Sequence, residues 1–478
     1  METDHIVLPI DLQQVITTEQ AWQYQVVPKL VEKGKVEFYV KEDSFSDETR
    51  EALELLLNKE IVLIRHDRDI VQKTLSKYYR KNAGKVTPAK AKINTQQADD
   101  FLHTLIAEAR ELRSSDIHIE TYEEKCRVRV RIDGLLIERY ILNRSDYPAL
   151  VNKIKIRGML DISEKRLPQD GRILFEAEGM KFDIRVSVLP TLYGEKIVLR
   201  LLSNDATNVD IKSLGFEERE LGDYMEGIKK PNGILLISGP TGSGKTTTLY
   251  ATLKILNKET TNILTVEDPI EYTLEGINQV QLKEAIGLTF AKALKTFLRQ
   301  DPDIIMLGEI RDGETAQMAI RAALTGHLVL STIHTNSAWG TISRLVDMGV
   351  EPFLLAGTIN TSVAQRLLRL LCPECKSTEA FDPKLFPKNF RAPRILKEHS
   401  TAVGCEHCHY TGYKGRKAIY EVIPIDFELA ECIRSNNLNV SDLLKERQIK
   451  TLSQNAFELF QGGETSLEEV YALLMNNF

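Results

Sequence analysis

The chain has 478 residues, of which 42 % are hydrophobic and 27 % charged, and a formal net charge of −6. The length allows about three domains, and the composition is ordinary for a soluble globular protein. The acidic balance gives no global attraction to nucleic acid or to an anionic membrane. The first 20 residues contain acids and no long apolar run, and no segment has the roughly 18 apolar residues of a membrane span. We therefore expect no signal peptide, no direct membrane insertion and a cytoplasmic protein that reaches a membrane only through partners.

Residues 1–80 are predicted to form a small α+β domain. The apolar segments 37–40 and 61–64 indicate strands, and residues 46–57 indicate a helix with acids in its first turn, where the helix dipole favours negative charge. This part of the chain contains no catalytic constellation, so we interpret it as an adaptor that docks on another protein.

Residues 81–93 are predicted to be a linker. The segment holds four lysines and no acid, together with Gly84 and Pro88. A solvated tether explains this composition, and contact with lipid or nucleic acid is the alternative.

Residues 94–202 are predicted to form a second α+β domain. A helix that begins at Thr95 carries apolar residues at the i, i+3, i+4, i+7 spacing. Segments 126–132 and 182–189 alternate apolar and polar residues, as half-buried strands do, and Asp133-Gly134 is a strong hairpin turn. Residues 203–211 are polar and lack periodicity, so we expect them to act as a hinge.

Residues 212–478 are predicted to form a third domain with a parallel α/β sheet, because short apolar segments alternate with helical ones. Residues 239–246 match the phosphate-binding loop pattern in full, after an apolar strand and before a helical run. Glycines let backbone N–H groups turn toward phosphate oxygens, and the helix N-terminus adds partial positive charge. We expect Lys245 to reach the β- and γ-phosphates and the Thr246 hydroxyl to ligate Mg²⁺. The predicted nucleotide-binding residues of the loop are Gly239, Pro240, Thr241, Gly242, Ser243, Gly244, Lys245, Thr246 and Thr247.

Two further apolar segments of this domain end in acids. Residues 304–308 lead to Glu309, and residues 263–266 lead to Glu267 before Pro269 stops the strand. Because the carboxyl ends of parallel strands meet at one edge of a sheet, we expect both carboxylates around one crevice. Glu309 suits a general base that holds the attacking water, with direct Mg²⁺ ligation as its competing role and Glu267 as the alternative base.

His334 ends a third predicted strand, residues 328–333. A histidine at a strand end is often structural, but its place beside the acidic strands favours a sensor of the γ-phosphate. His327 precedes the same strand, and its role stays open.

Four cysteines form two C-x-x-C pairs, and residues 376–404 separate the pairs. In a reducing compartment this pattern favours a metal over disulfides. Two such pairs complete a tetrahedron around Zn²⁺ and leave no open position, which indicates a structural site in an insertion at 372–408. His407 or His409 could replace one thiolate, but four cysteines are the simpler set. The predicted zinc ligands are Cys372, Cys375, Cys405 and Cys408.

Several motifs occur in the order that is typical of one family. Segments 239–246, 265–272, 299–312 and 323–336 resemble the Walker A motif, Asp box, atypical Walker B motif and His box of the type II secretion and type IV pilus assembly ATPases. Upstream, the three segments 114–120, 168–172 and 183–187 resemble the second N-terminal domain of that family. The similarity extends from about residue 95 to 475.

The resemblance implies a homo-hexamer of RecA-like motor domains that binds ATP between the motor domain and the domain before it. It also implies that Arg172 and Arg185 of the upstream domain close on the γ-phosphate, and that Arg311 acts in trans. Leu214, Gly215 and Phe216 match the family's loop near the nucleotide base. The implied partner of the adaptor is the cytoplasmic domain of an inner-membrane platform protein, with no nucleic acid.

The predicted function is therefore an ATP-hydrolysing motor that powers type II protein secretion by pseudopilus assembly. The zinc tetrad and the extra N-terminal domain favour secretion or assembly over pilus retraction. Type IV pilus extension is the alternative, and a DNA-translocating motor is a second alternative that the acidic charge disfavours. Intact Lys245, Thr246 and Glu309 argue against a non-catalytic scaffold.

Overall fold

The computed structural model describes residues 6, 8–13, 15–32, 34–41, 44–79, 89–91, 98–177, 180–202 and 209–475. Much of the linker expected at 81–93 and of the hinge expected at 203–211 lies outside these residues. The chain divides into two compact units. The first unit contains residues 1–86, 370–415 and 456–478, and the second contains residues 87–369 and 416–455.

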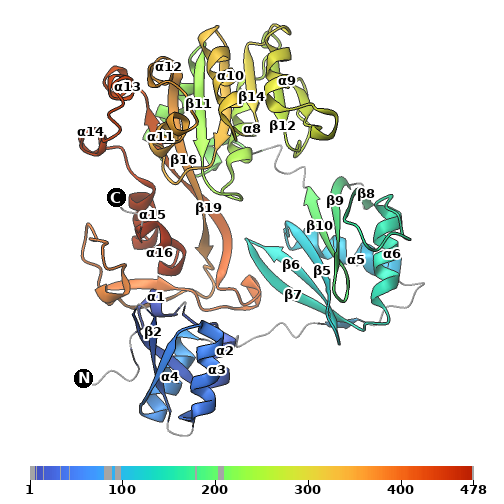
Figure 1. Cartoon of the computed structure of the whole chain (residues 1–478), viewed down its shortest axis with the longest axis vertical. Coiled ribbons are helices and arrows are strands. Elements are labelled where there is room, and N and C mark those ends of the chain that lie inside the picture. The colour runs from blue at the N-terminus through green and yellow to red at the C-terminus, as the bar shows by residue number, and fades with distance from the viewer. Residues whose placement is uncertain are drawn as a thin grey trace. The chain divides into compact units, whose positions relative to one another are not determined.

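The N-terminal part of the first unit is a three-stranded sheet, in the order β1-β2-β3, with four helices (Figure 1). The expected strands at 37–40 and 61–64 are β2 and β3, and the expected helix is α3, for which the Ser46 hydroxyl is the N-cap. The elements are α1 (Ile10–Gln13), α2 (Thr18–Tyr24), β1 (Val26–Glu32), β2 (Lys35–Val40), α3 (Asp47–Leu57), β3 (Glu60–Arg65) and α4 (Arg68–Tyr78).

The cysteine-rich part of the first unit is more regular than the sequence suggests. Between the two C-x-x-C pairs, β17 (Ser377–Ala380) and β18 (Glu398–Thr401) form an antiparallel hairpin. Phe381 packs against Phe386 and against Phe460, which lies on α15 (Leu452–Gln461). These aromatic contacts pack the segment between the cysteine pairs against α15. The last helix is α16 (Leu467–Met475).

The second unit begins with a sheet in the order β4-β7-β6-β5-β10-β9-β8. One face of this sheet and the apolar sides of α5 and α6 share a single core. The turn Asp133-Gly134 joins β6 to β7 with φ of 47° and 85°, as expected for a two-residue hairpin. The elements are β4 (Ala89–Ala91), α5 (Ala98–Glu111), β5 (Asp116–Thr121), β6 (Cys126–Ile132), β7 (Leu135–Leu142), α6 (Tyr147–Arg157), β8 (Gln169–Ala177), β9 (Met180–Thr191) and β10 (Gly194–Leu202).

Strand β4 lies inside the segment that the sequence indicated as a linker. It pairs in parallel with β7, with Ala89 opposite Tyr140 and Ala91 opposite Leu142. Part of this segment therefore extends the sheet at its edge. The domain boundaries drawn from the sequence stay a prediction.

The remainder of the second unit is built on a seven-stranded sheet in the order β13-β12-β14-β15-β11-β16-β19. The pairs from β13 to β16 are parallel, so the carboxyl ends of these strands meet at one edge. The strands are β11 (Gly233–Ser238), β12 (Ile263–Glu267), β13 (Asn278–Gln281), β14 (Ile304–Leu307), β15 (Leu328–Ile333), β16 (Ile359–Leu371) and β19 (Tyr413–Pro424).

Helices alternate with these strands as a parallel sheet requires. After residue 370 the chain returns to this sheet as β19, a twelve-residue strand. The helices are α7 (Glu218–Lys229), α8 (Lys245–Leu256), α9 (Phe290–Phe297), α10 (Gly313–Leu324), α11 (Gly340–Asp347), α12 (Pro352–Thr358), α13 (Phe427–Arg434) and α14 (Ser441–Glu446). Within the described residues, no helix has the length and apolarity needed to cross a membrane.

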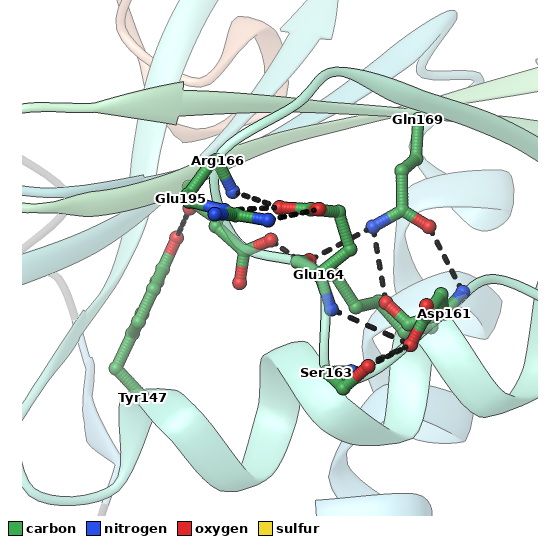
Figure 2. Close-up of polar contacts among 8 residues, drawn as sticks. Tyr147, Asp161, Ser163, Glu164, Arg166, Gln169 and Glu195 are labelled. Atoms are coloured by element: carbon green, nitrogen blue, oxygen red, sulfur yellow. Dashed lines mark hydrogen bonds and ion pairs between the residues drawn. The ribbon is translucent and has the colours of Figure 1, made fainter.

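A buried ion pair fixes the loop that leads into β8. Lys155 on α6 is 0 % exposed, and its Nζ lies 2.5 Å from Glu195 Oε1 and donates to the Glu164 carbonyl at 2.6 Å. Figure 2 shows the loop around these groups: the Gln169 amide donates to the carbonyls of Asp161 and Glu164, both at 3.0 Å. The start of β8 is therefore held to α6 and to β10 by polar contacts.

Replacing Lys155 with methionine should destabilise this domain, because Glu195 would stay buried without its cation. We expect a loss of about 3–5 kcal/mol in the opening free energy, measured by hydrogen exchange of peptides from residues 150–200. Lys153→Met is the matched control on the same helix, since Lys153 is partly exposed and lies 3.8 Å from Asp99. The opening free energy of Lys153→Met should fall by less than about 1 kcal/mol. Equal decreases in the two variants would contradict the ion-pair account.

Candidate nucleotide site and metal centre

The predicted phosphate-binding loop connects the fully buried strand β11 to α8. Gly239, Gly242 and Gly244 have φ of 152°, 81° and 89°, which L side chains rarely adopt. A Cβ on Gly239 would lie 2.5 Å from the Gln365 carbonyl oxygen, and one on Gly244 would lie 2.9 Å from Gln365 Nε2. Glycine is needed here both for the backbone conformation and for the close packing of the loop on β16.

Lys245 begins α8 and is 9 % exposed. Its Nζ donates to the carbonyls of Gly239 at 2.7 Å and Pro240 at 3.1 Å. Burial lowers the pKa of Lys245, while the nearby Glu309 carboxylate opposes the shift. Thr246 is exposed in the first turn of the helix. A buried lysine at a helix N-terminus forms a site for an anion with several oxygens.

Glu309 and His334 come together at the carboxyl edge of the sheet, as the sequence predicts. Glu309 follows β14 and His334 follows β15, and His334 Nε2 lies 3.1 Å from Glu309 Oε2. Arg311 Nε donates to the other oxygen of Glu309 at 2.6 Å and its guanidinium also reaches Asp268 at 3.3 Å. In this chain Arg311 thus contacts acids of its own active-site edge.

Glu267 lies at the end of β12 but in a different environment from Glu309. It is 3 % exposed and accepts hydrogen bonds from the Tyr250 hydroxyl, from Thr265 Oγ1 at 2.6 Å and from Gln279 Nε2 at 3.1 Å. Burial, followed by the Glu267 charge, raises the pKa of Tyr250, which keeps this donor protonated. The structure therefore does not bring the two carboxylates to a shared polar contact, and Glu267 ties β12 to α8 and β13.

His327 lies at the opposite end of β15 from His334. Its Nδ1 is 2.8 Å from the Ala322 carbonyl and 3.2 Å from Thr325 Oγ1, where α10 ends. These contacts give His327 a structural role at a helix C-terminus.

Arg172 and Arg185 stand opposite each other on β8 and β9. Arg185 donates to the Ile270 carbonyl, and its Nη1 lies 3.2 Å from Glu271 Oε2. Arg172 lies 3.5 Å from the Gln281 side chain and is otherwise exposed. In the described residues, both arginines make their polar contacts with the segments after β12 and at the end of β13, and not with residues 239–247.

The predicted base loop lies against the core of the nucleotide-binding sheet. Phe216 stacks on Tyr420 with ring centroids 3.5 Å apart and planes 10° from parallel. The Tyr420 hydroxyl donates to the Leu214 carbonyl at 3.4 Å and lies 3.4 Å from Thr248 Oγ1 on α8. A Cβ on Gly215 would come within 2.6 Å of the Ala418 carbonyl oxygen, so glycine permits this close approach.

Sequence reasoning missed two polar residues of β16 that border the phosphate-binding loop. Gln365 is 2 % exposed and accepts from Thr248 Oγ1 at 3.0 Å. Arg366 donates to the carbonyls of Gln365 and Asn336, both at 3.0 Å, and burial lowers its pKa. The signal available in the sequence was the Gln365-Arg366 pair, which interrupts the apolar residues at 363–364 and 367–368.

The four predicted metal ligands converge in the first unit. Sγ atoms lie 3.9 Å apart for Cys372 and Cys405, and 3.8 Å apart both for Cys375 and Cys408 and for Cys405 and Cys408. A tetrahedron with metal–sulfur bonds of about 2.3 Å has edges of about 3.8 Å. Among the described residues the cluster comprises these four thiols and neither His407 nor His409.

Backbone groups support the same cluster. The N–H of Gly404 donates to Cys375 Sγ at 3.2 Å, and those of Cys405 and Gly412 donate to Cys408 Sγ at 3.2 and 3.3 Å. Such bonds stabilise negative charge on sulfur, which a metal-binding thiolate carries. The donor set therefore fits a tetrahedral metal with four sulfur ligands.

Comparison with known proteins finds a family that covers both the phosphate-binding loop and the four cysteines. The model of the type II/IV secretion system protein family matches residues 92–472. The chain belongs to this family. The chain is similar to Type II secretion system ATPase E of Vibrio cholerae, at 45 % identity over 377 residues that cover 77 % of this chain and 74 % of that protein. As a member of the family the chain is an ATPase.

The chain is also similar to two pilus proteins. Type IV pilus assembly ATPase PilB of Myxococcus xanthus is 48 % identical over 377 residues, which cover 77 % of this chain and 66 % of that protein. The crystal structure of the pilus retraction motor PilT with bound ADP is 28 % identical, covers 78 % of this chain and 96 % of its own, and has a TM-score of 0.54. The mixed α/β, multi-domain fold expected from the sequence is confirmed.

Proposed function

We propose that this chain is the ATP-hydrolysing motor of a type II protein secretion machine and acts as a homo-hexamer. The observation that carries the proposal is the buried Lys245 in a phosphate-binding loop, at the same sheet edge as the Glu309–His334 pair. The similarity to type II secretion ATPases supports the assignment to secretion. Pilus assembly is the second candidate, favoured by the 48 % identity to a pilus assembly ATPase.

The proposed site binds the triphosphate of ATP through the amides of residues 239–246 and Lys245. Mg²⁺ held by the Thr246 hydroxyl would neutralise part of the charge on the β- and γ-phosphates. Leu214, Gly215 and Phe216 provide the surface near the base. Glu309 accepts a proton from water as the water oxygen bonds to the γ-phosphorus, and the bond from phosphorus to the bridging oxygen breaks to leave ADP.

His334 orients the Glu309 carboxylate through their contact at 3.1 Å, and in this proposal it senses the γ-phosphate. We assign the base to Glu309 and not to Glu267, because the Glu309 side chain is 18 % exposed at the sheet edge, whereas Glu267 is 3 % exposed and bound by three donors. Glu267 then positions β12 and the acidic loop after it.

Arg172 and Arg185 close the upstream domain on the γ-phosphate in this proposal. Loss of the γ-phosphate releases that domain, which then moves relative to the motor domain. In a ring this movement becomes a stroke delivered to a platform protein at the cytoplasmic side of the inner membrane. The N-terminal domain, with a sheet and core of its own, is the element we propose to dock there.

Glu309→Gln should bind ATP within about threefold of wild type but lower kcat by about 10² to 10⁴, because glutamine cannot accept the proton. Steady-state phosphate release and nucleotide titration measure the two effects. Glu267→Gln is the matched control, for which we expect a lower melting temperature with turnover retained. Retained turnover in Glu309→Gln together with its loss in Glu267→Gln would move the base to Glu267.

We further propose that the four cysteines bind one structural Zn²⁺ per chain, which clamps the segment at 372–408. Purified protein should contain about one zinc per chain by elemental analysis, and Cys405→Ser should lose it. Cys126→Ser is the control, since Cys126 is buried in another domain. Metal-free wild-type protein with normal hydrogen-exchange protection at residues 370–415 would overturn the zinc assignment.

A further inference from the structure

A row of charged residues crosses the outer face of the first sheet of the second unit. Strand pairing places Arg172 on β8 opposite Arg185 on β9, and Arg185 opposite Arg200 on β10. Arg200 stands opposite Asp116 on β5, and Asp116 stands opposite Arg131 on β6. Figure 1 shows these five strands side by side in one sheet. The two arginines that we propose to act on the γ-phosphate are thus members of a longer row.

Side chains alternate along a strand, so the residues next to this row define its other face. Those neighbours are at most 4 % exposed and belong to the shared core. They are Ile173, Ile184, Leu199, Ile117 and Val130. The charged row therefore points away from the core, on the same face as Arg172 and Arg185.

The row carries four arginines and one carboxylate. Asp116 is shared, since Arg200 Nε lies 3.1 Å from its Oδ1 and Arg131 Nε lies 3.5 Å from its Oδ2. Like charges directly opposite on neighbouring strands are unfavourable, yet Arg172, Arg185 and Arg200 are adjacent. Glu271 pairs with Arg185 at 3.2 Å, so the four arginines of the row meet two carboxylates. The remaining positive charge is suited to an anion that approaches the face.

Cations elsewhere on the same face are compensated. Glu120 lies 2.9 Å from Arg127, 2.8 Å from Arg129 and 3.2 Å from Lys196. Although burial opposes the shift, these three cations hold the pKa of Glu120 at about 2. This cluster is a closed ion-pair network, whereas Arg200 keeps 58 % of its side chain exposed beside Arg185.

We propose that Arg200 is a third arginine of the γ-phosphate clamp, held ready by Asp116. Neighbouring strands lie about 4.8 Å apart, so Arg200 flanks Arg185 on one side as Arg172 does on the other. Its guanidinium donates to γ-phosphate oxygens when the domain closes. This inference rests on the proposed action of Arg172 and Arg185 on ATP.

The test uses the full-length chain with Arg200→Gln, and Arg127→Gln as the matched control on the same face. Dissociation constants are measured for a non-hydrolysable ATP analogue and for ADP. Because Arg200→Gln loses charged hydrogen bonds to the γ-phosphate, it should weaken binding of the analogue by about tenfold or more and binding of ADP by less than about twofold. Arg127→Gln should change neither constant, and kcat should fall in Arg200→Gln alone.

Arg185→Gln separates failure of this inference from failure of the proposed function. Suppose that Arg185→Gln weakens binding of the ATP analogue but not of ADP, while Arg200→Gln changes neither dissociation constant. Arg200 then forms only a surface ion pair and the inference is wrong. If neither variant weakens binding of the ATP analogue relative to ADP, the proposed action of the upstream domain on the γ-phosphate is itself wrong. Equal weakening of both nucleotides in a folded Arg200→Gln would also contradict the inference, since that result indicates a structural role.

Discussion

The site depends on keeping a lysine charged while it is almost fully buried. Within the described residues, the two contacts of the Lys245 ammonium are with carbonyl oxygens of the loop that it follows, and burial lowers its pKa. Such a cation is costly without an anion. Lys245 is the first residue of α8, so the partial positive charge of that helix N-terminus adds to its own charge and favours an anion bound from solution.

Other parts of the sheet add to this electrostatic arrangement. Arg366, also partly buried, donates to two carbonyls at the border of the loop, so two cations lie close together. Glu309 is the nearby acid, and His334 and Arg311 hold its two oxygens. A bound triphosphate would compensate the charges of Lys245 and Arg366, and the Glu309 carboxylate would act at the γ-phosphate. The arginine row of the upstream domain, with Arg172, Arg185 and Arg200, likewise gathers cations that a bound anion could compensate.

Sequence patterns predicted the parts of the site that depend on strand ends and on close spacing. Glu309 and His334 meet because both follow strands of one parallel sheet, and the cysteine pairs converge because each C-x-x-C brings two sulfurs together. The sequence could not show the structural role of Glu267, since two of its hydrogen-bond donors, Tyr250 and Gln279, come from other elements. The stack of Phe216 on Tyr420 joins residues about two hundred positions apart, which no local pattern reveals.

The central claim is that ATP hydrolysis at Lys245 drives this chain as a secretion motor and not as a nucleic-acid motor. The most direct measurement is steady-state ATPase activity of wild type and Lys245→Ala, on protein whose assembly state is determined by light scattering, with and without DNA. The account predicts activity that requires Lys245, rises with the hexamer content and is unaffected by DNA. Activity that survives in Lys245→Ala, or that appears only with DNA, would contradict it.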